Sequence, residues 1–332
     1  MRKLFFLACV FAIAAVALPP AVNAGDFDMS QIYTIDSGHS YLGFQVKYMG
    51  FAKVRGRMTD FSGTIRFDEN DLTKTSITAR IAVERINTEH DTRDKDLESA
   101  NWFDAETYPE IGFQSKRAVA SGDGFDLVGD LTIRGVTREV RLEMNEFSGV
   151  MKDIRDDTQI IWTGTTVIDR KEFGVAGERW SAIKEGIAGV ESEVLIELTI
   201  LGKRINAPNF RNWVRNPERP SGKIYGTLGE SGLEAALSEY DAMRAADTEE
   251  RLGAWCLNVV GTMLLKEDRI DDAITVFKRN TELYPEDGEV YESLGEAYAY
   301  KGDFESAREN YNVALEMNPR NINAVEILRH LD

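Results

Sequence analysis

The stretch Phe125–Met144, FDLVGDLTIRGVTREVRLEM, decides the fold of the larger part of this chain. Apolar and polar residues alternate along it with period two, which is typical of strands with one buried face. Arg134 and Gly135 interrupt the alternation at its centre like a two-residue hairpin loop. The residues that share the apolar face are Phe125, Leu127, Gly129, Leu131 and Ile133 before the loop and Val140, Leu142 and Met144 after it. The stretch therefore predicts an antiparallel β-hairpin.

The same alternation recurs on both sides of this hairpin, from Ile32 to Ile200. It predicts roughly eight or more strands within about 170 residues, with almost no helix between them. A sandwich or a closed antiparallel barrel accommodates such a series, and the period alone does not choose between them. Further runs are Leu42–Tyr48, Phe61–Phe67, Ile77–Val83, Ile161–Val167 and Val194–Ile200.

The apolar faces of these strands combine aromatic rings with very small residues such as Gly63 and Ala79. One interpretation is a tightly packed core, in which the small residues make room for the rings. The other is an apolar cavity, because an eight-stranded barrel is wide enough to hold one small ligand. The residues themselves leave both open.

One segment, Asn87–Phe113 (NTEHDTRDKDLESANWFDAETYPEIGF), breaks the strand pattern. A charged run opens it, the apolar residues Leu97, Trp102 and Phe103 follow, and Tyr108-Pro109 closes it. Proline restricts the residue before it to extended geometry, so the strand pattern resumes there. We expect one or two helical turns that form a lid over an opening of the β-domain.

The first residues have the pattern of a secretory signal peptide: Arg2 and Lys3, an apolar run from Leu4 to Leu18, and small residues up to Ala24. We expect residues 1–24 to be removed after Ala24 and the protein to be exported. Cys9 would leave with the signal, so Cys256 has no partner for an intramolecular disulfide. The net charge of −17 disfavours nucleic acid as a partner.

Nothing in the histidine pattern indicates catalysis or a metal. His39, His90 and His330 are scattered and lack the spacing of zinc ligands. His39 with Ser40 and Asp36 superficially resembles a hydrolase triad, but the three are local neighbours and no Gly-x-Ser-x-Gly elbow exists. We therefore predict no catalytic residue, no metal site and no cofactor.

After Gly202 the pattern changes. Residues 203–223 contain several prolines and basic residues and predict an irregular linker, with Phe210 and Trp213 attached to a domain surface. Residues 224–332 are helical and repeat after 34 residues, as Gly261 and Gly295 illustrate. The spacing resembles the tetratricopeptide repeat, and two repeats need flanking helices to cap them. From Leu228 onward 23 acidic residues face 10 basic ones, which favours a basic peptide or protein partner or merely reflects solvated helix faces.

The β-region resembles the YceI-like polyisoprenoid-binding family. The resemblance spans about 170 residues in order and includes the hairpin loop described above. Its motifs are Tyr33–Ser40 with Gly43-Phe44, Val54–Arg57 with Phe61–Gly63, Arg93-Asp94 with Leu97, Phe103-Asp104 with Tyr108-Pro109, Gly129–Thr137, and Asp169-Arg170 with Phe173-Gly174.

This resemblance implies a lipocalin-like antiparallel barrel over residues 30–202, located in the periplasm, that binds a long isoprenoid of the polyprenyl phosphate or ubiquinone class. It favours the cavity over the packed core. We expect the cavity to be lined by Phe44, Val46, Phe61, Phe67, Ile81, Trp102, Phe103, Phe113, Phe125 and Leu131, and the head group to meet His39, Arg55, Arg57 and Arg93.

The predicted protein is thus a non-enzymatic lipid carrier with a small helical module for protein interaction, and it does not span the membrane. Two alternatives stay open. One is an enzyme that acts on a lipid or quinone, and the other is an interaction protein whose barrel is packed and merely structural.

Overall fold

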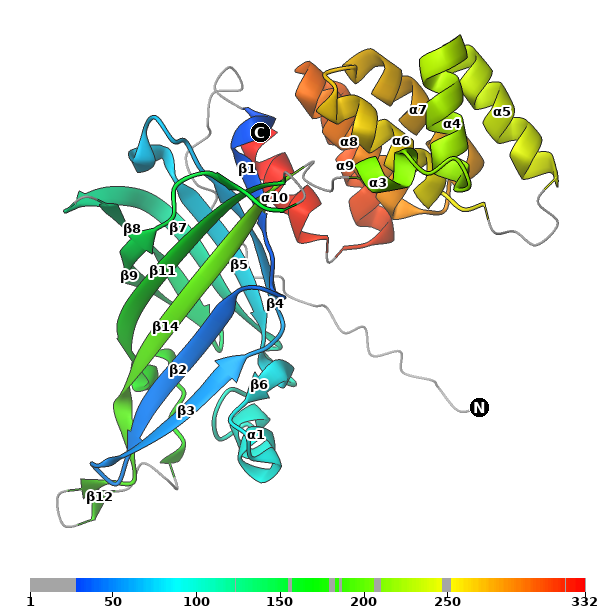
Figure 1. Cartoon of the computed structure of the whole chain (residues 1–332). Coiled ribbons are helices and arrows are strands. Elements are labelled where there is room, and N and C mark those ends of the chain that lie inside the picture. The colour runs from blue at the N-terminus through cyan, green and yellow to red at the C-terminus, as the bar shows by residue number, and fades with distance from the viewer. Residues whose placement is uncertain are drawn as a thin grey trace, which may run out of the picture.

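The computed structural model describes residues 28–122, 124–154, 157–178, 183–184, 187–205, 210–246, 252–319 and 321–331. They form an antiparallel β-barrel followed by a stack of helices (Figure 1). This confirms the predicted fold class. The predicted signal peptide, residues 1–24, lies outside the described residues.

Eight of the described strands close the barrel in the order β11-β9-β8-β7-β5-β4-β1-β14, because β14 pairs with β11 as well as with β1. A two-stranded hairpin, β12 with β13, lies apart from the main sheet. The strands are β1 (Ile32–Ile35), β2 (Tyr41–Tyr48), β3 (Ala52–Met58), β4 (Phe61–Arg66), β5 (Ser76–Ala82), β6 (Ile86–Asn87), β7 (Glu110–Ser121), β8 (Gly124–Ile133), β9 (Val136–Phe147), β10 (Met151–Lys152), β11 (Thr158–Asp169), β12 (Ile183–Lys184), β13 (Ile187–Ala188) and β14 (Val190–Arg204).

The hairpin between β8 and β9 is the one predicted from the sequence. Ile133 pairs with Val136, and the two loop residues Arg134 and Gly135 have φ angles of 49° and 70°. Left-handed geometry at both positions matches the right-handed twist of the flanking strands. Local sequence therefore determines the register of this hairpin.

The long strand β14 gives the barrel two different ends. Near its C-terminus it pairs with β1, and nearer its N-terminus with β2. The β2–β3 hairpin extends the wall at this second end, where β3 pairs with β6 only at Arg57 and Met58. We call the end that carries this hairpin and helix α1 (Asp91–Glu98) the mouth (Figure 1).

The opposite end of the barrel is closed by packed aromatic rings. Trp162 is fully buried at its centre, with ring centroids of Phe67, Phe125 and Phe147 at 5.4, 5.9 and 5.1 Å. Tyr33 extends the cluster from β1, 6.3 Å from Phe67. These rings fill the cross-section, so the closed end is a solid core.

The helical region contains three antiparallel pairs, α4 with α5, α6 with α7 and α8 with α9, followed by α10. Its helices are α3 (Arg211–Val214), α4 (Pro220–Ser231), α5 (Leu233–Ala246), α6 (Trp255–Lys266), α7 (Ile270–Leu283), α8 (Gly288–Lys301), α9 (Phe304–Met317) and α10 (Ile322–Leu331). A Cβ at Gly261 would lie 2.5 Å from the ring of Phe277, so the repeat position predicted to be small is the one where α6 and α7 touch. Cys256 is buried in this core, as expected.

The segment upstream of the repeats is more ordered than the sequence indicated. Helix α4 begins at Pro220, inside residues 203–223, and turns into α5 at Gly232, where φ is 87°. Proline in the first turn and glycine at the end are favourable helix boundaries. The predicted boundary between linker and helices, at residue 224, falls inside this helix. The prolines that indicated a linker include Pro220, which marks the start of this helix.

The helical stack packs against the closed end of the barrel. Met29, Ile32 and Ile205 share a buried apolar cluster with Ile327 and Leu331 of α10. Across the same boundary Lys266 Nζ lies 3.0 Å from the buried carboxylate of Asp157, and the Tyr300 hydroxyl donates to the Ile205 carbonyl. The two parts therefore meet through an apolar contact with polar bonds around it.

Candidate functional site

The mouth half of the barrel encloses a cavity of about 790 Å³. Inward-facing residues of β1, β2, β3, β4, β5, β7, β8, β9, β11 and β14 line it, and α1 with the following turns lies at its mouth. Apart from a few polar groups, its wall is aliphatic and aromatic. Predominantly apolar lining with few polar groups is typical of small-molecule sites of roughly 300–1,000 Å³.

Eight of the ten residues expected at the cavity do line it: Phe44, Val46, Phe61, Ile81, Trp102, Phe103, Phe113 and Leu131. Phe67 and Phe125 do not. They belong to the aromatic cluster around Trp162 at the closed end, where inward-facing rings meet the opposite wall. The barrel is thus part packed core and part cavity, which combines the two interpretations that the sequence left open.

Helix α1 and the residues just before it contribute most of the polar side chains that line the cavity. Its N-cap is His90, whose Nδ1 accepts the Arg93 amide at 3.3 Å. The Arg93 guanidinium folds back to Thr88, with Nε 2.8 Å from the hydroxyl and one terminal nitrogen 2.6 Å from the carbonyl. Asp94 accepts the Thr88 amide at 2.9 Å. These bonds hold the charged run in one shape, with Thr88, His90 and Arg93 on the cavity wall.

Arg170 is a cavity residue that the sequence analysis did not single out. It is 5% exposed, and its guanidinium donates to the carbonyls of Val175, Ala176, Val190 and Glu191 at 2.5–3.0 Å. Burial lowers the pKa of this guanidinium, while Asp169 opposes the shift. The Asp169-Arg170 motif was the available signal, but nothing in the sequence placed it inside the barrel. Arg170 therefore places a buried positive charge in the half of the barrel nearer the mouth.

Trp102 is fixed in place at the mouth. Its Nε1 donates to Asp96 at 3.0 Å, its carbonyl accepts from Arg134 at 2.8 Å, and the Arg170 guanidinium lies 5.0 Å from its ring centroid. A Cβ on Gly177 would lie 2.4 Å from the ring. Arg134 also donates to the Gly174 carbonyl at 2.8 Å and so joins three mouth loops. Trp102 therefore lines the cavity in a position that its neighbours fix.

Of the four residues expected at a head group, the structure brings only Arg93 to the cavity. Arg55 and Arg57 lie on the outer face of β3 and are exposed, because Val54 and Met58 take the inward positions. His39 lies in the turn after β1, where its Nδ1 is 2.9 Å from Asp36 and its side chain is 70% exposed. Burial raises the pKa of Asp36, but hydrogen bonds from Lys203 and His39 outweigh it and lower the pKa overall.

A second, polar groove of about 410 Å³ runs between β9 and β11 on the outside. The two strands pair from Trp162–Phe147 to Thr165–Glu143 and no further toward the mouth. Arg138, Arg141 and Glu172 line the groove, and Val140, Thr166 and Ile168 separate it from the cavity, since they line both. The barrel wall is therefore not continuously hydrogen-bonded here.

Within the described ranges no group of three His, Cys, Asp or Glu residues is placed to hold a metal ion. In the same ranges, none of the helices combines the length and apolar character needed to cross a membrane.

A closed barrel with an apolar cavity, joined to helical repeats, defines a binding protein. The sequence profile of the YceI-like domain matches residues 33–201, just over half of the chain, and that of the tetratricopeptide repeat matches residues 288–321. The chain belongs to the YceI-like family, which is a family of binding domains, and carries a tetratricopeptide repeat in addition.

Several known proteins are similar to parts of this chain. A UPF0312 protein of Vibrio parahaemolyticus is 32% identical over 205 residues, which are 61% of this chain and 98% of the relative. A UPF0312 protein of Staphylococcus aureus is 37% identical over 146 residues, 43% of this chain and 81% of the relative. Solved structures with similarity include Burkholderia cenocepacia BcnA (TM-score 0.42, 24% identity, 50% of this chain and 98% of that one). Another is a polyisoprenoid binding domain from Saccharophagus degradans (TM-score 0.39, 17% identity, 53% and 98%).

Proposed function

We propose that this protein is an exported, periplasmic carrier that holds a long isoprenoid lipid of the polyprenyl phosphate or ubiquinone class in its barrel and meets a protein partner through its helical repeats. The observation that carries the proposal is the cavity of about 790 Å³, whose lining is apolar except for Thr166, Arg170 and the polar groups around α1. An unbranched fatty chain would fill such a space as well, so the isoprenoid class rests on the family.

The polarity of the lining supports one orientation of the lipid. The chain would lie among Phe44, Phe113 and Leu198, and the head group would lie near Arg93 and Arg170. A phosphate would gain charge-assisted hydrogen bonds from the Arg93 guanidinium, and a quinone carbonyl would accept from the same donor. Arg170 would act through its charge, because its guanidinium already donates to four backbone carbonyls. Both head groups of the proposed class fit this cationic end.

The magnitude of chain burial supports a carrier that releases its lipid slowly. Each buried CH₂ group contributes about 0.8 kcal/mol, so ten isoprenoid carbons already contribute on the order of 8 kcal/mol. The cost of ordering a flexible chain offsets part of this gain. We expect the lipid to remain bound through purification.

Mass spectrometry of solvent extracts tests the proposal directly. Protein purified from the periplasm of an isoprenoid-producing host should yield one isoprenoid species in near-stoichiometric amount. Ala79 lines the cavity, and Ala79→Phe should fill part of the space and lower the extracted lipid severalfold while circular dichroism stays unchanged. Tyr41 lies on the outer face of β2, and Tyr41→Phe should retain the lipid. Empty wild-type protein from such a host, or equal lipid in Ala79→Phe, would count against a lipid-filled cavity.

The repeats are proposed to bind a protein or peptide, and part of their surface is already taken by the chain itself. Phe210 and Val214 pack with Val259 and Met263 of α6 and Tyr225 of α4. A partner would therefore use the remaining helix faces, whose charge is strongly acidic. Cross-linking in the native compartment, followed by identification of the linked peptides, tests whether a partner contacts α5 to α9.

A further inference from the structure

The β2–β3 hairpin at the mouth ends in a tip of exposed apolar side chains. Phe51 is 92% exposed, Met49 52% and Tyr48 36%. Met49 also has a left-handed φ of 53°, which side chains other than glycine, asparagine and aspartate rarely adopt. A polar turn would satisfy this geometry at lower cost, so folding does not explain the apolar tip.

The tip continues the lining of the cavity. Tyr48, Val46 and Val54 of the same hairpin line the cavity wall, and Phe51 follows Tyr48 across the turn. An apolar surface thus runs from inside the barrel to the outermost point of the mouth. Figure 1 shows this hairpin at the end of the barrel opposite the helical repeats, so none of the helices that the structure describes there covers it.

The outer face of the same hairpin is basic, although the chain as a whole has a net charge of −17. Lys47, Lys53, Arg55 and Arg57 are all exposed there. Lys47 lies 3.7 Å from Glu191, whereas no described carboxylate forms an ion pair with Lys53, Arg55 or Arg57. The exposed Glu193 and Glu197 belong to the neighbouring strand β14, which confines the positive charge to β3 and the tip.

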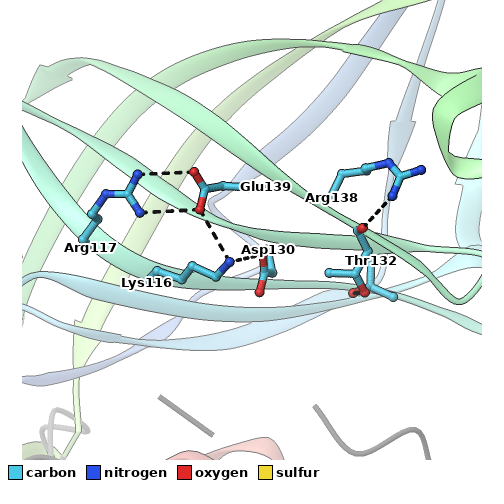
Figure 2. Close-up of polar contacts among 7 residues, drawn as sticks. Lys116, Arg117, Asp130, Thr132, Arg138 and Glu139 are labelled. Atoms are coloured by element: carbon cyan, nitrogen blue, oxygen red, sulfur yellow. Dashed lines mark hydrogen bonds and ion pairs between the residues drawn. The ribbon is translucent and has the colours of Figure 1, made fainter. Parts of the chain in front are cut away.

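Two exposed cations on the outer wall of the barrel are neutralised, whereas Arg85, Lys95, Arg138 and Lys171 are exposed without an ion pair to a described carboxylate. On the outer wall of β7, Lys116 lies 2.6 Å from Asp130 and Arg117 lies 3.3 Å from Glu139, as Figure 2 shows. Cations on an unpaired strand edge also guard against aggregation, and β3 is such an edge. Protection against aggregation explains why Lys53 and Arg55 are basic, but it does not explain the exposed Phe51 beside them.

We infer that the β2–β3 hairpin is a docking element for an anionic lipid bilayer. Phe51 and Met49 would enter the headgroup boundary while Lys53, Arg55 and Arg57 lie against anionic headgroups. Apolar insertion together with basic side chains is the combination by which peripheral proteins bind anionic membranes. The inference goes beyond lipid carriage and holds whether or not the cavity is occupied, because every group involved lies outside the barrel.

Flotation of the full chain with vesicles tests the inference. The protein should float with vesicles of phosphatidylglycerol mixed with phosphatidylcholine and not with phosphatidylcholine alone, and high salt should weaken binding. Phe51→Ser should lower the affinity about tenfold or more, and Phe51→Leu should retain it. The triple change Lys53→Gln, Arg55→Gln and Arg57→Gln should lower it about a hundredfold, since each cation near the surface contributes about fivefold.

Matched controls separate docking from general apolar or charge effects. Ile154 is fully exposed on the turn between β10 and β11, at the end of β11 that pairs with the C-terminal part of β14 and lies away from the mouth. Ile154→Ser should leave vesicle binding unchanged, as should Lys116→Gln with Arg117→Gln. Equal flotation of the hairpin variants and the wild type would overturn the inference. So would a self-associated form, seen by sedimentation velocity and lost in Phe51→Ser, because the tip would then join two copies of this chain.

Discussion

Trp102 illustrates how single residues hold the mouth together. Its indole bonds to Asp96, stacks beneath the Arg170 guanidinium and touches the backbone at Gly177, while its carbonyl accepts from Arg134. Phe103, its neighbour, also lines the cavity but is only half-buried and has none of these polar bonds. The two aromatics of the predicted lid are therefore not equivalent.

This difference gives a prediction for lipid release. Trp102→Ala should speed the loss of bound lipid but also lower stability by about 3–5 kcal/mol, because it removes a large buried side chain. Phe103→Ala should speed release with a smaller loss of stability. Release can be followed by transfer of extracted lipid to acceptor vesicles, and stability by chemical unfolding of both variants. A Trp102→Ala protein as stable as Phe103→Ala would contradict the fixed position of Trp102.

Arg170 leads to a second prediction at this scale. Arg170→Met removes the donors to four backbone carbonyls. The Val175 carbonyl is buried and its lost bond costs about 1–3 kcal/mol, whereas the other three are partly exposed and water can replace the donor. We expect a thermal midpoint lower by several degrees, with loosening of the turns after Phe173. Hydrogen exchange at the amides of Val175 and Gly177 reports that loosening. Unchanged exchange there would mean that Arg170 does not organise these turns.

At the scale of elements, alternation along the sequence determined which side chains face inward but not how far along the barrel they lie. Phe67 and Phe125 were expected at the cavity because they face inward, yet only contacts between distant strands place them beside Trp162. Arg55 and Arg57 were expected at a head group, although alternation with Val54 and Met58 already assigned them to the outer face. The sequence therefore predicts which face of a strand a residue occupies, but it does not predict which residues of distant strands it contacts.

Arg134-Gly135 shows the opposite case, in which the sequence determined the outcome. Two left-handed residues fix a hairpin loop, and the strands on each side follow its register. The repeat spacing of 34 residues likewise identified α6 to α9, because Gly261 and Gly295 must be small where paired helices touch. The first turn of helix α4 was assigned to the linker because proline and basic residues are equally common in linkers.

Helix α8 carries a prediction about pH. One carboxylate oxygen of Glu296 is buried and has no hydrogen-bond partner among the described residues, and burial together with nearby Glu292 raises the pKa of Glu296 to about 8. The folded chain therefore keeps a proton that the unfolded chain releases near its ordinary pKa of 4.5. Stability should fall as pH rises between these two values and level off above the higher one.

The matched variants for this prediction lie on the same helix. Glu296→Gln should abolish most of the decline and raise the thermal midpoint at alkaline pH by a few degrees. Glu289 is exposed, so Glu289→Gln should leave the pH dependence of the midpoint as it is in the wild type. A wild-type midpoint that is constant across this pH range would show that Glu296 is ionised and solvated.

On the scale of the whole molecule, the barrel and the repeats share a buried contact far from the mouth. Met29, Ile32 and Ile205 would become exposed if the helices were removed, whereas the cavity lining would be untouched. We expect a chain without residues 206–332 to retain its lipid but to unfold at a lower temperature and to aggregate. Mass spectrometry and thermal scanning measure the two properties. Ile205→Ser in the shortened chain should reduce aggregation, and loss of lipid would show that the repeats support the cavity.

Strand β14 runs from the mouth to the helical contact and comprises 15 residues. At about 3.3 Å per residue it is about 50 Å long, and the usual tilt of barrel strands reduces its height to about 40 Å. A copy seated on a bilayer by its hairpin would thus carry its repeats at a fixed elevation, several headgroup layers above the lipid. In that arrangement the barrel would serve as a rigid spacer as well as a container, and it would select partners by how far they reach from the surface.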